Sequence, residues 1–136
     1  VTLSRWTAAA RPVEAPAWRE VVLRHRMRKP PSLRASEQAT SPLSWGLPPG
    51  VVLLDKQTLA EPQTAPAVIA HEMAHITRGD WIFLVLSRLA LALFWFNPLV
   101  WIVHRQLIER SEEAADAIAL GQVDRQTYAR ALVGLA

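Results

Sequence analysis

Two histidines separated by three residues, with a glutamate beside the first, are the side chains in this sequence best suited to chemistry. His71, Glu72 and His75 form an HExxH pattern. On an α-helix, residues four apart lie on one face, so both imidazoles can reach one zinc ion. Glu72, turned about 100° around the helix, approaches a water molecule at that metal. The pattern predicts a zinc-dependent hydrolase with Glu72 as its general base.

A catalytic zinc site requires a third protein ligand and one open position. The chain has no cysteine, so this ligand must be another histidine or a carboxylate. Glu112 and Asp116 are four residues apart, which allows Glu112 to bind zinc while Asp116 accepts the outer N–H of a ligating histidine. The alternative is an acidic, solvated helix face. The full set of candidates is His25, His104, Glu109, Glu112, Glu113 and Asp116.

Helices must position these side chains. Pro66 near a first helical position and Gly79 after the last one predict a helix over residues 66–78, with Thr64 or Ala65 as its cap. Asp80 is expected to cap a second helix over residues 81–96. Further helices are expected over residues 98–120 and, after Asp124, over residues 125–136.

Two short apolar segments before the first helix predict strands. Residues 41–47 and Val51–Leu54 flank the turn formed by Pro48, Pro49 and Gly50, which indicates a small antiparallel sheet. An exposed edge of the Val51–Leu54 strand would be able to hold an extended peptide substrate by strand addition.

Residues 81–103 form a nearly continuous apolar run of 23 residues. A single membrane crossing would leave His75 and Glu112 on opposite sides, where they could not share a metal ion. We therefore expect a helical hairpin that turns at Asn97 and Pro98. Its first arm, roughly 24 Å long, is shorter than a hydrocarbon core of about 30 Å. The hairpin either dips into lipid or forms part of the protein core.

The composition fits one compact domain, with 51% hydrophobic and 20% charged residues among 136. The net charge of +3 is too small to indicate a nucleic-acid-binding protein. Residues 1–34 hold eight basic and two acidic side chains, and we interpret them as a basic, juxtamembrane linker that is either solvated or drawn to anionic lipid. Residues 35–136 form the predicted zinc peptidase domain. A start at Val1 suggests a fragment of a larger membrane protein.

Several separated blocks of the sequence resemble the BlaR/MecR-type antirepressor family of integral-membrane zinc metallopeptidases. Residues 71–80 (HEMAHITRGD) match its HExxH-I-x-R-x-D block, and residues 94–101 (FWFNPLVW) match its FWFNPLVW signature. Residues 41–46, 112–116 and 128–129 also fit, so the resemblance covers residues 35–135. Ala115 stands where the family usually has cysteine, which is not a zinc ligand in this type of site.

The resemblance implies an α+β, mainly helical, zincin-like domain of the gluzincin type. It implies that His71, His75 and Glu112 hold zinc and that Glu72 is the general base. It also implies that Asp116 supports the site by accepting a hydrogen bond from a ligating histidine. It also implies a bacterial membrane location with the catalytic domain facing the cytoplasm, which agrees with the basic leader. A transcriptional repressor as substrate follows only by family analogy. No sensor domain is present in these residues, so β-lactam sensing is not expected of them.

Our prediction is therefore a membrane-associated zinc metalloendopeptidase, with a protein or peptide substrate and membrane lipid as partners and no direct contact with nucleic acid. His104, Arg110 and Tyr128 are candidate donors to the transition-state oxyanion. The rival is a non-catalytic, zinc-containing signalling or interaction module, which gives no reason for a carboxylate at Glu72. A third alternative, an amphipathic membrane-surface protein without a metal, predicts no zinc.

Overall fold

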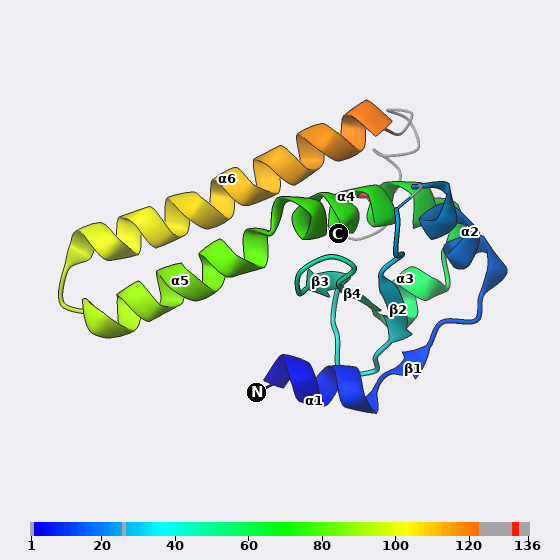
Figure 1. Ribbon diagram of the computed structural model, residues 1–136, viewed down its shortest axis with the longest axis horizontal. Helices are drawn as coiled ribbons and strands as arrows, with labels where there is room; N and C mark the ends of the chain where they lie inside the picture. Colours follow the sequence, from blue (N-terminus) through cyan, green and yellow to red (C-terminus); the bar gives the residue numbers. More distant parts are fainter. Residues whose placement is uncertain (1, 26, 123–131, 134–136) are drawn as a thin grey trace.

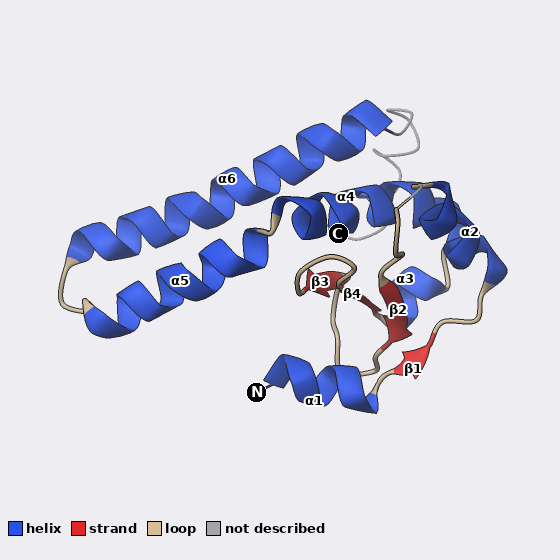
Figure 2. Ribbon diagram, viewed as in Figure 1, coloured by secondary structure: helices blue, strands red, loops and turns tan. Residues whose placement is uncertain are grey.

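The computed structural model describes residues 2–25, 27–122 and 132–133. A small sheet and its surrounding helices form one end of the molecule, and two long helices extend from it (Figure 1). Figure 2 shows the predominance of helix over strand. The helices are α1 (Thr2–Ala9), α2 (Pro16–Arg24), α3 (Lys56–Leu59), the 3-10 helix η1 (Pro62–Thr64), α4 (Ala65–Arg78), α5 (Asp80–Leu93) and α6 (Pro98–Gln122). The strands are β1 (Arg11–Pro12), β2 (Ser32–Ala35), β3 (Leu43–Trp45) and β4 (Val51–Leu54).

The sheet is mixed, with the strand order β1-β2-β4-β3. β3 and β4 form the predicted antiparallel pair, but β2 runs parallel to β4 and pairs Ser32 with Val51. The prediction of a purely antiparallel sheet was therefore wrong. Parallel pairing joins strands that are distant in the chain, so the turn signals around β3 and β4 could not reveal it.

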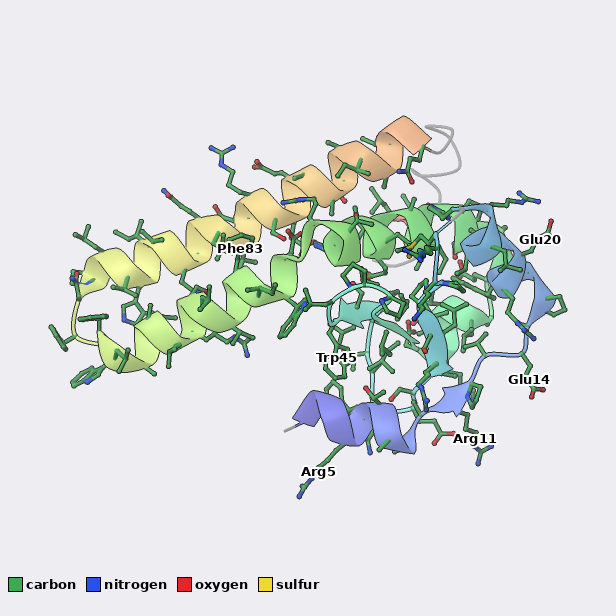
Figure 3. The ribbon with its side chains drawn as sticks, viewed as in Figure 1. Arg5, Arg11, Glu14, Glu20, Trp45 and Phe83 are labelled. Atoms are coloured by element: carbon green, nitrogen blue, oxygen red, sulfur yellow. The ribbon has the colours of Figure 1, made fainter. Side chains whose placement is uncertain are left out.

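The boundary predicted at residue 34 falls inside β2. Upstream of it, α2 packs against α4, with Trp18 fully buried and Val22 buried one turn later. The intervening Arg19 and Glu20 are exposed, and Glu20 points away from the body in Figure 3. The Arg- and Pro-rich composition hid the pattern of this short amphipathic helix, in which only Trp18 and Val22 are buried and Val21 is partly buried against the core.

The main core lies between the sheet and the helices α2 and α4. It holds the buried residues Val13, Trp18, Val22, Val52, Leu54, Ala65, Val68, Ile69, Met73 and Ile76. The turn before β4 touches this core closely, since a Cβ atom at Gly50 would come within 3.0 Å of the Ile76 side chain. Helix α4, predicted over residues 66–78, therefore rests with one apolar face on the sheet.

Small residues bring α6 close to α4. Ala67 and Ala70 of α4 form a buried cluster with Ala119 of α6. Ser111 and Ala115 continue the buried row on α6 at intervals of four residues. Because these side chains are short, the two helix backbones can approach each other, and residues beside the row on α6 face α4.

Helices α5 and α6 lie side by side, and we call their outer part, residues 81–108, the α5–α6 arm (Figure 1). Helix α5 ends at Leu93, earlier than predicted, and the side chain of Asn97 accepts a hydrogen bond from Leu99 N at the start of α6. Many apolar side chains of the arm are exposed, including Phe83, which is labelled in Figure 3. Within the described residues, no helix is both long and apolar enough for a membrane crossing.

Candidate metal centre

Helix α4 holds the two histidines one turn apart, as their spacing predicts. The Nε2 atoms of His71 and His75 are 3.2 Å apart, and both side chains are partly buried. When each ring carries its proton on Nδ1, both Nε2 lone pairs are available at this spacing to bind one metal ion.

Helix α6 adds the carboxylate of Glu112. Its oxygens lie 3.4 Å from His71 Nε2 and 3.6 Å from His75 Nε2. Ligands on a tetrahedral zinc ion with bonds of about 2.1 Å lie roughly 3.3–3.5 Å from one another. The oxygen near His71 is Oε2 and the one near His75 is Oε1, so both carboxylate oxygens face the imidazoles. One ligand atom from each of the three residues lies within 4.8 Å of the others, and the group could therefore hold a metal ion.

The outer nitrogens of both imidazoles face carboxylates. His71 Nδ1 is 3.0 Å from Asp116 Oδ1, and His75 Nδ1 is 2.8 Å from Asp80 Oδ2. An Nδ1–H that donates to a carboxylate leaves the Nε2 lone pair free for a metal. Asp116 thus occupies the place that its spacing from Glu112 predicts, and Asp80 occupies the corresponding place behind the second histidine.

The prediction that Asp80 caps the second helix was wrong. Gly79, with a φ of 68°, is the residue before α5, and Asp80 is the first residue of that helix. Its carboxylate accepts hydrogen bonds from His75 Nδ1 and from Ser111 Oγ at 2.8 Å, and it lies 3.3 Å from Arg78 Nη2. Gly79 was the available signal in the sequence. Its left-handed conformation between the two helices lets Asp80, five residues after His75, turn back toward that histidine.

Glu72 is buried at the same site. The hydroxyl of Ser44 on β3 donates to the backbone carbonyl of Glu72 at 3.2 Å, which joins the sheet to the HExxH turn. Burial raises the pKa of the Glu72 carboxyl, and Ser44 and the two histidines act in the opposite direction. A carboxyl with a raised pKa is a suitable proton acceptor near neutral pH.

A pocket of about 280 Å³ opens between β3, α4, α5 and α6. It is lined by Ser41, Pro42, Leu43, Ser44, His71, Glu72, His75, Asp80, Trp81, Leu84, Ser111 and Glu112. The buried Nε1–H of Trp81 has no hydrogen-bond partner within the described part of the chain. Sequence reasoning placed Trp81 only in an apolar run and did not assign it to this pocket.

The protonation of His71 and Glu112 is linked. The hydrogen bond that His71 donates to the Glu112 carboxylate is the main cause that raises the pKa of His71, against the effect of burial. The same hydrogen bond lowers the pKa of Glu112. Without a metal, the pair thus favours a protonated imidazole beside a carboxylate, and a metal cation at this position would replace that proton.

The three proposed oxyanion donors do not line this pocket within the described residues. His104 Nδ1 lies 2.8 Å from Ser87 Oγ inside the α5–α6 arm. Arg110 is exposed and pairs with Glu113 at 3.0 Å. Tyr128 lies outside the described residues, as does most of the helix expected over residues 125–136. His25, an early candidate ligand, lies near the end of α6, where its Nε2 is 3.3 Å from Gln122 Oε1.

An HExxH helix whose imidazoles face a carboxylate on a second helix is the arrangement typical of HExxH metallopeptidases. The chain belongs to the BlaR1 peptidase M56 family, whose sequence model matches residues 5–136. This finding confirms the family resemblance, and membership of this family suggests a peptidase.

Two curated relatives are regulatory proteins. The chain is 25% identical over 118 residues to "Regulatory protein BlaR1" of Staphylococcus aureus, an alignment that covers 83% of this chain and 20% of the relative. It is 26% identical over 97 residues to "Regulatory protein BlaR1" of Bacillus licheniformis, covering 71% of this chain and 16% of the relative. The chain therefore spans a fifth or less of the length of these relatives.

Proposed function

We propose that this chain is a zinc metalloendopeptidase module that hydrolyses peptide bonds of a protein substrate. The observation that carries the proposal is the convergence of three ligand groups. The Nε2 atoms of His71 and His75 lie 3.2 Å apart, and one ligand atom from each of His71, His75 and Glu112 lies within 4.8 Å of the others. The buried carboxyl of Glu72 in the same pocket supplies a base. Gluzincin-type chemistry is the proposal that unites these features.

The residues divide the work of hydrolysis. A zinc ion held by His71, His75 and Glu112 would supply the Lewis acid that acidifies water and polarises a carbonyl. Glu72 takes a proton from the attacking water and returns it to the leaving amine nitrogen. Asp116 keeps the His71 imidazole oriented by accepting from its Nδ1–H group.

The free edge of β3 is our proposed substrate-binding strand. The sequence placed this role on Val51–Leu54, but that strand is β4, which is paired on both sides, so the prediction was wrong. β3 is one of the two edge strands of the sheet, and its residues Leu43 and Ser44 line the pocket beside Glu72. An extended peptide added to this edge would therefore pass the metal centre.

We further propose that the module acts at a bacterial membrane, facing the cytoplasm, in antirepressor-type signalling. The exposed apolar side chains of the α5–α6 arm support contact with lipid. The names of the relatives support a regulatory role, and a transcriptional repressor is the substrate that the family analogy suggests. Zinc, lipid and substrate protein are thus the proposed partners.

A cleavage assay at matched zinc content tests the proposal. Wild-type protein and Glu72→Gln, each quantified for zinc, would be incubated with a generic peptide library and the products identified by mass spectrometry. We expect Glu72→Gln to retain zinc and to lose at least about 100-fold in cleavage rate, as expected for a removed general base. Full activity in that variant would contradict the role of Glu72.

The rival function is a non-catalytic zinc module. The names of the two relatives favour it, because they describe regulatory proteins. The same assay separates the two functions. Stoichiometric zinc with no turnover in folded wild-type protein, supplied with lipid, would favour the rival. Turnover that depends on Glu72 would favour the peptidase, because metal binding alone does not require that carboxyl.

A further inference from the structure

Three helices converge on the carboxylate of Asp80. It receives His75 Nδ1 from α4 and Ser111 Oγ from α6, both at 2.8 Å, and it is itself the first residue of α5. We infer that Asp80 is the positioning residue that fixes the tautomer and orientation of His75. The inference rests on the proposed zinc site, because His75 is a proposed ligand there.

The surroundings of Asp80 suit this role better than those of Asp116. The Asp80 side chain is 8% exposed and the Asp116 side chain 44%. A buried carboxylate with several fixed donors keeps its direction, and its hydrogen bonds are little weakened by water. We therefore expect His75 to depend on Asp80 more than His71 depends on Asp116.

Arg78 and Ser111 act on His75 through Asp80. Arg78 Nη2 lies 3.3 Å from Asp80 Oδ1, while its Nη1 donates to the backbone carbonyl of Ser111 at 3.2 Å. The guanidinium thus joins the end of α4 to α6 and compensates the buried charge of Asp80. With one oxygen facing Arg78 and the other facing Ser111, the carboxylate has a single orientation toward His75.

Zinc affinity is the first test. Wild type, Asp80→Ala, Asp80→Asn and Asp116→Asn would compete for zinc with a chelator of known affinity at one fixed pH. Glu113→Gln is the matched control, because Glu113 is an exposed acid of α6 that pairs with Arg110 outside the pocket. We expect Asp80→Ala to bind zinc about 100-fold and Asp80→Asn about 10-fold more weakly. The control should stay within about twofold of wild type, and Asp116→Asn should lose less than Asp80→Asn.

The tautomer of His75 in the metal-free protein is the second test, and a merely structural role would not change it. Proton–nitrogen NMR at pH 8 should show the proton on Nδ1 in wild type. Asp80→Ala should lose this preference, whereas Asp80→Asn should keep it, since the amide oxygen can still accept. Circular dichroism verifies that each variant is folded, and Asp80→Asn decides the zinc comparison if Asp80→Ala does not fold.

Zinc binding by folded Asp80→Asn within twofold of wild type would overturn the inference, as would an unchanged tautomer in folded Asp80→Ala. If wild type binds no zinc, the proposed function fails, and the tautomer then decides the inference alone. Loss of the Nδ1 proton in Asp80→Ala would still support it in that case.

Discussion

At the scale of single residues, Glu72 is the proposed general base, and its burial opposes its ionisation. Its carboxyl is buried beside two imidazoles, and burial raises its pKa above the ordinary value of 4.5. Ionised Glu72 therefore lowers the stability of the metal-free fold. The stability associated with its protonated form is complete below pH 4.5 and is lost as the pH rises through the higher pKa of the folded state.

We predict that Glu72→Gln stabilises the metal-free protein at neutral pH. The amide is nearly isosteric and does not ionise, so the gain should be on the order of 1 kcal/mol, a usual size when a strained site residue is relieved. Denaturant unfolding of both proteins at pH 7 and pH 4 measures it. The gain should shrink at pH 4, and equal stabilities at pH 7 would show that ionised Glu72 costs the fold nothing.

Proton competition for His71 gives a second prediction at this scale. Because Glu112 raises the pKa of His71 in the metal-free protein, protons should compete with zinc at a higher pH than for an ordinary histidine of pKa 6.5. Zinc affinity should therefore begin to fall at a higher pH as the solution is acidified.

Glu112→Gln removes both a proposed zinc ligand and the cause of the raised pKa of His71. We expect this variant to bind zinc more than about 100-fold more weakly than wild type. Loss of a residue that only hydrogen-bonds to a metal ligand typically weakens binding by about 10–100-fold. The onset of the acid-side fall in affinity should move to lower pH. Chelator competition from pH 5 to 8 measures both effects, and an onset unchanged in Glu112→Gln would remove Glu112 as the cause.

At the scale of elements, the contact between α4 and α6 sets the distance from the histidines to Glu112. Ala115 of α6 is fully buried next to this contact, and Ala67, Ala70 and Ala119 form the small cluster beyond it. A larger side chain in this row would separate the two helices, because a packed interior has no room to accommodate it.

We predict that Ala115→Leu lowers the free energy of unfolding by about 1–3 kcal/mol, the usual cost of overpacking, and weakens zinc binding. Ala117→Leu, at an exposed position of the same helix, is the matched control and should change neither quantity appreciably. Thermal unfolding and chelator competition provide the measurements. Wild-type zinc affinity in Ala115→Leu would mean that helix spacing does not set the site.

Local signals predicted α4, α5 and α6, because helix-breaking residues mark their ends. Pro66, Gly79 and the Asn97-Pro98 pair lie where α4, α5 and α6 begin or end. α2 and β2 were missed, since Arg and Pro dominate their composition and the partner of β2 is remote in the chain. Pattern alone does not show which strands lie side by side.

The residues of the candidate site also divide into those that local spacing predicts and those that only the fold brings together. HExxH fixes the spacing of His71, Glu72 and His75 within one helix, and the spacing of Glu112 and Asp116 is equally local. The contacts of Asp80 with Ser111 and Arg78 depend on how three helices meet, so no spacing rule could predict them. His104 was proposed from its residue type alone, and the arm carries it to Ser87 instead.

At the scale of the whole molecule, the α5–α6 arm is an apolar projection beside a polar metal centre (Figure 1). The side chains near its end are the most exposed apolar groups of the arm, with Trp95 at 69% and Phe96 at 68%. Exposed apolar surface on this scale marks a site of contact with lipid or protein. Aromatic side chains of this kind suit a membrane interface.

We predict that the chain binds lipid vesicles through this end of the arm. The double substitution Trp95→Ser with Phe96→Ser should weaken binding to vesicles of mixed neutral and anionic lipid, measured by co-sedimentation, at least about 30-fold. Each buried aromatic contributes on the order of 1–2 kcal/mol, and about 1.4 kcal/mol is a factor of ten. Leu23→Ser is the control, because Leu23 of α2 is 66% exposed but lies off the arm. Equal losses in both variants would contradict a specific role of the arm.

The zinc content of the purified chain tests the central claim most directly. Elemental analysis of wild type should give one zinc ion per chain, and His71→Ala, verified as folded by circular dichroism, should give none after the same dialysis. That result would place the metal on the HExxH helix beside Glu112. Wild-type protein without zinc, or zinc retained in full by His71→Ala, would contradict the account.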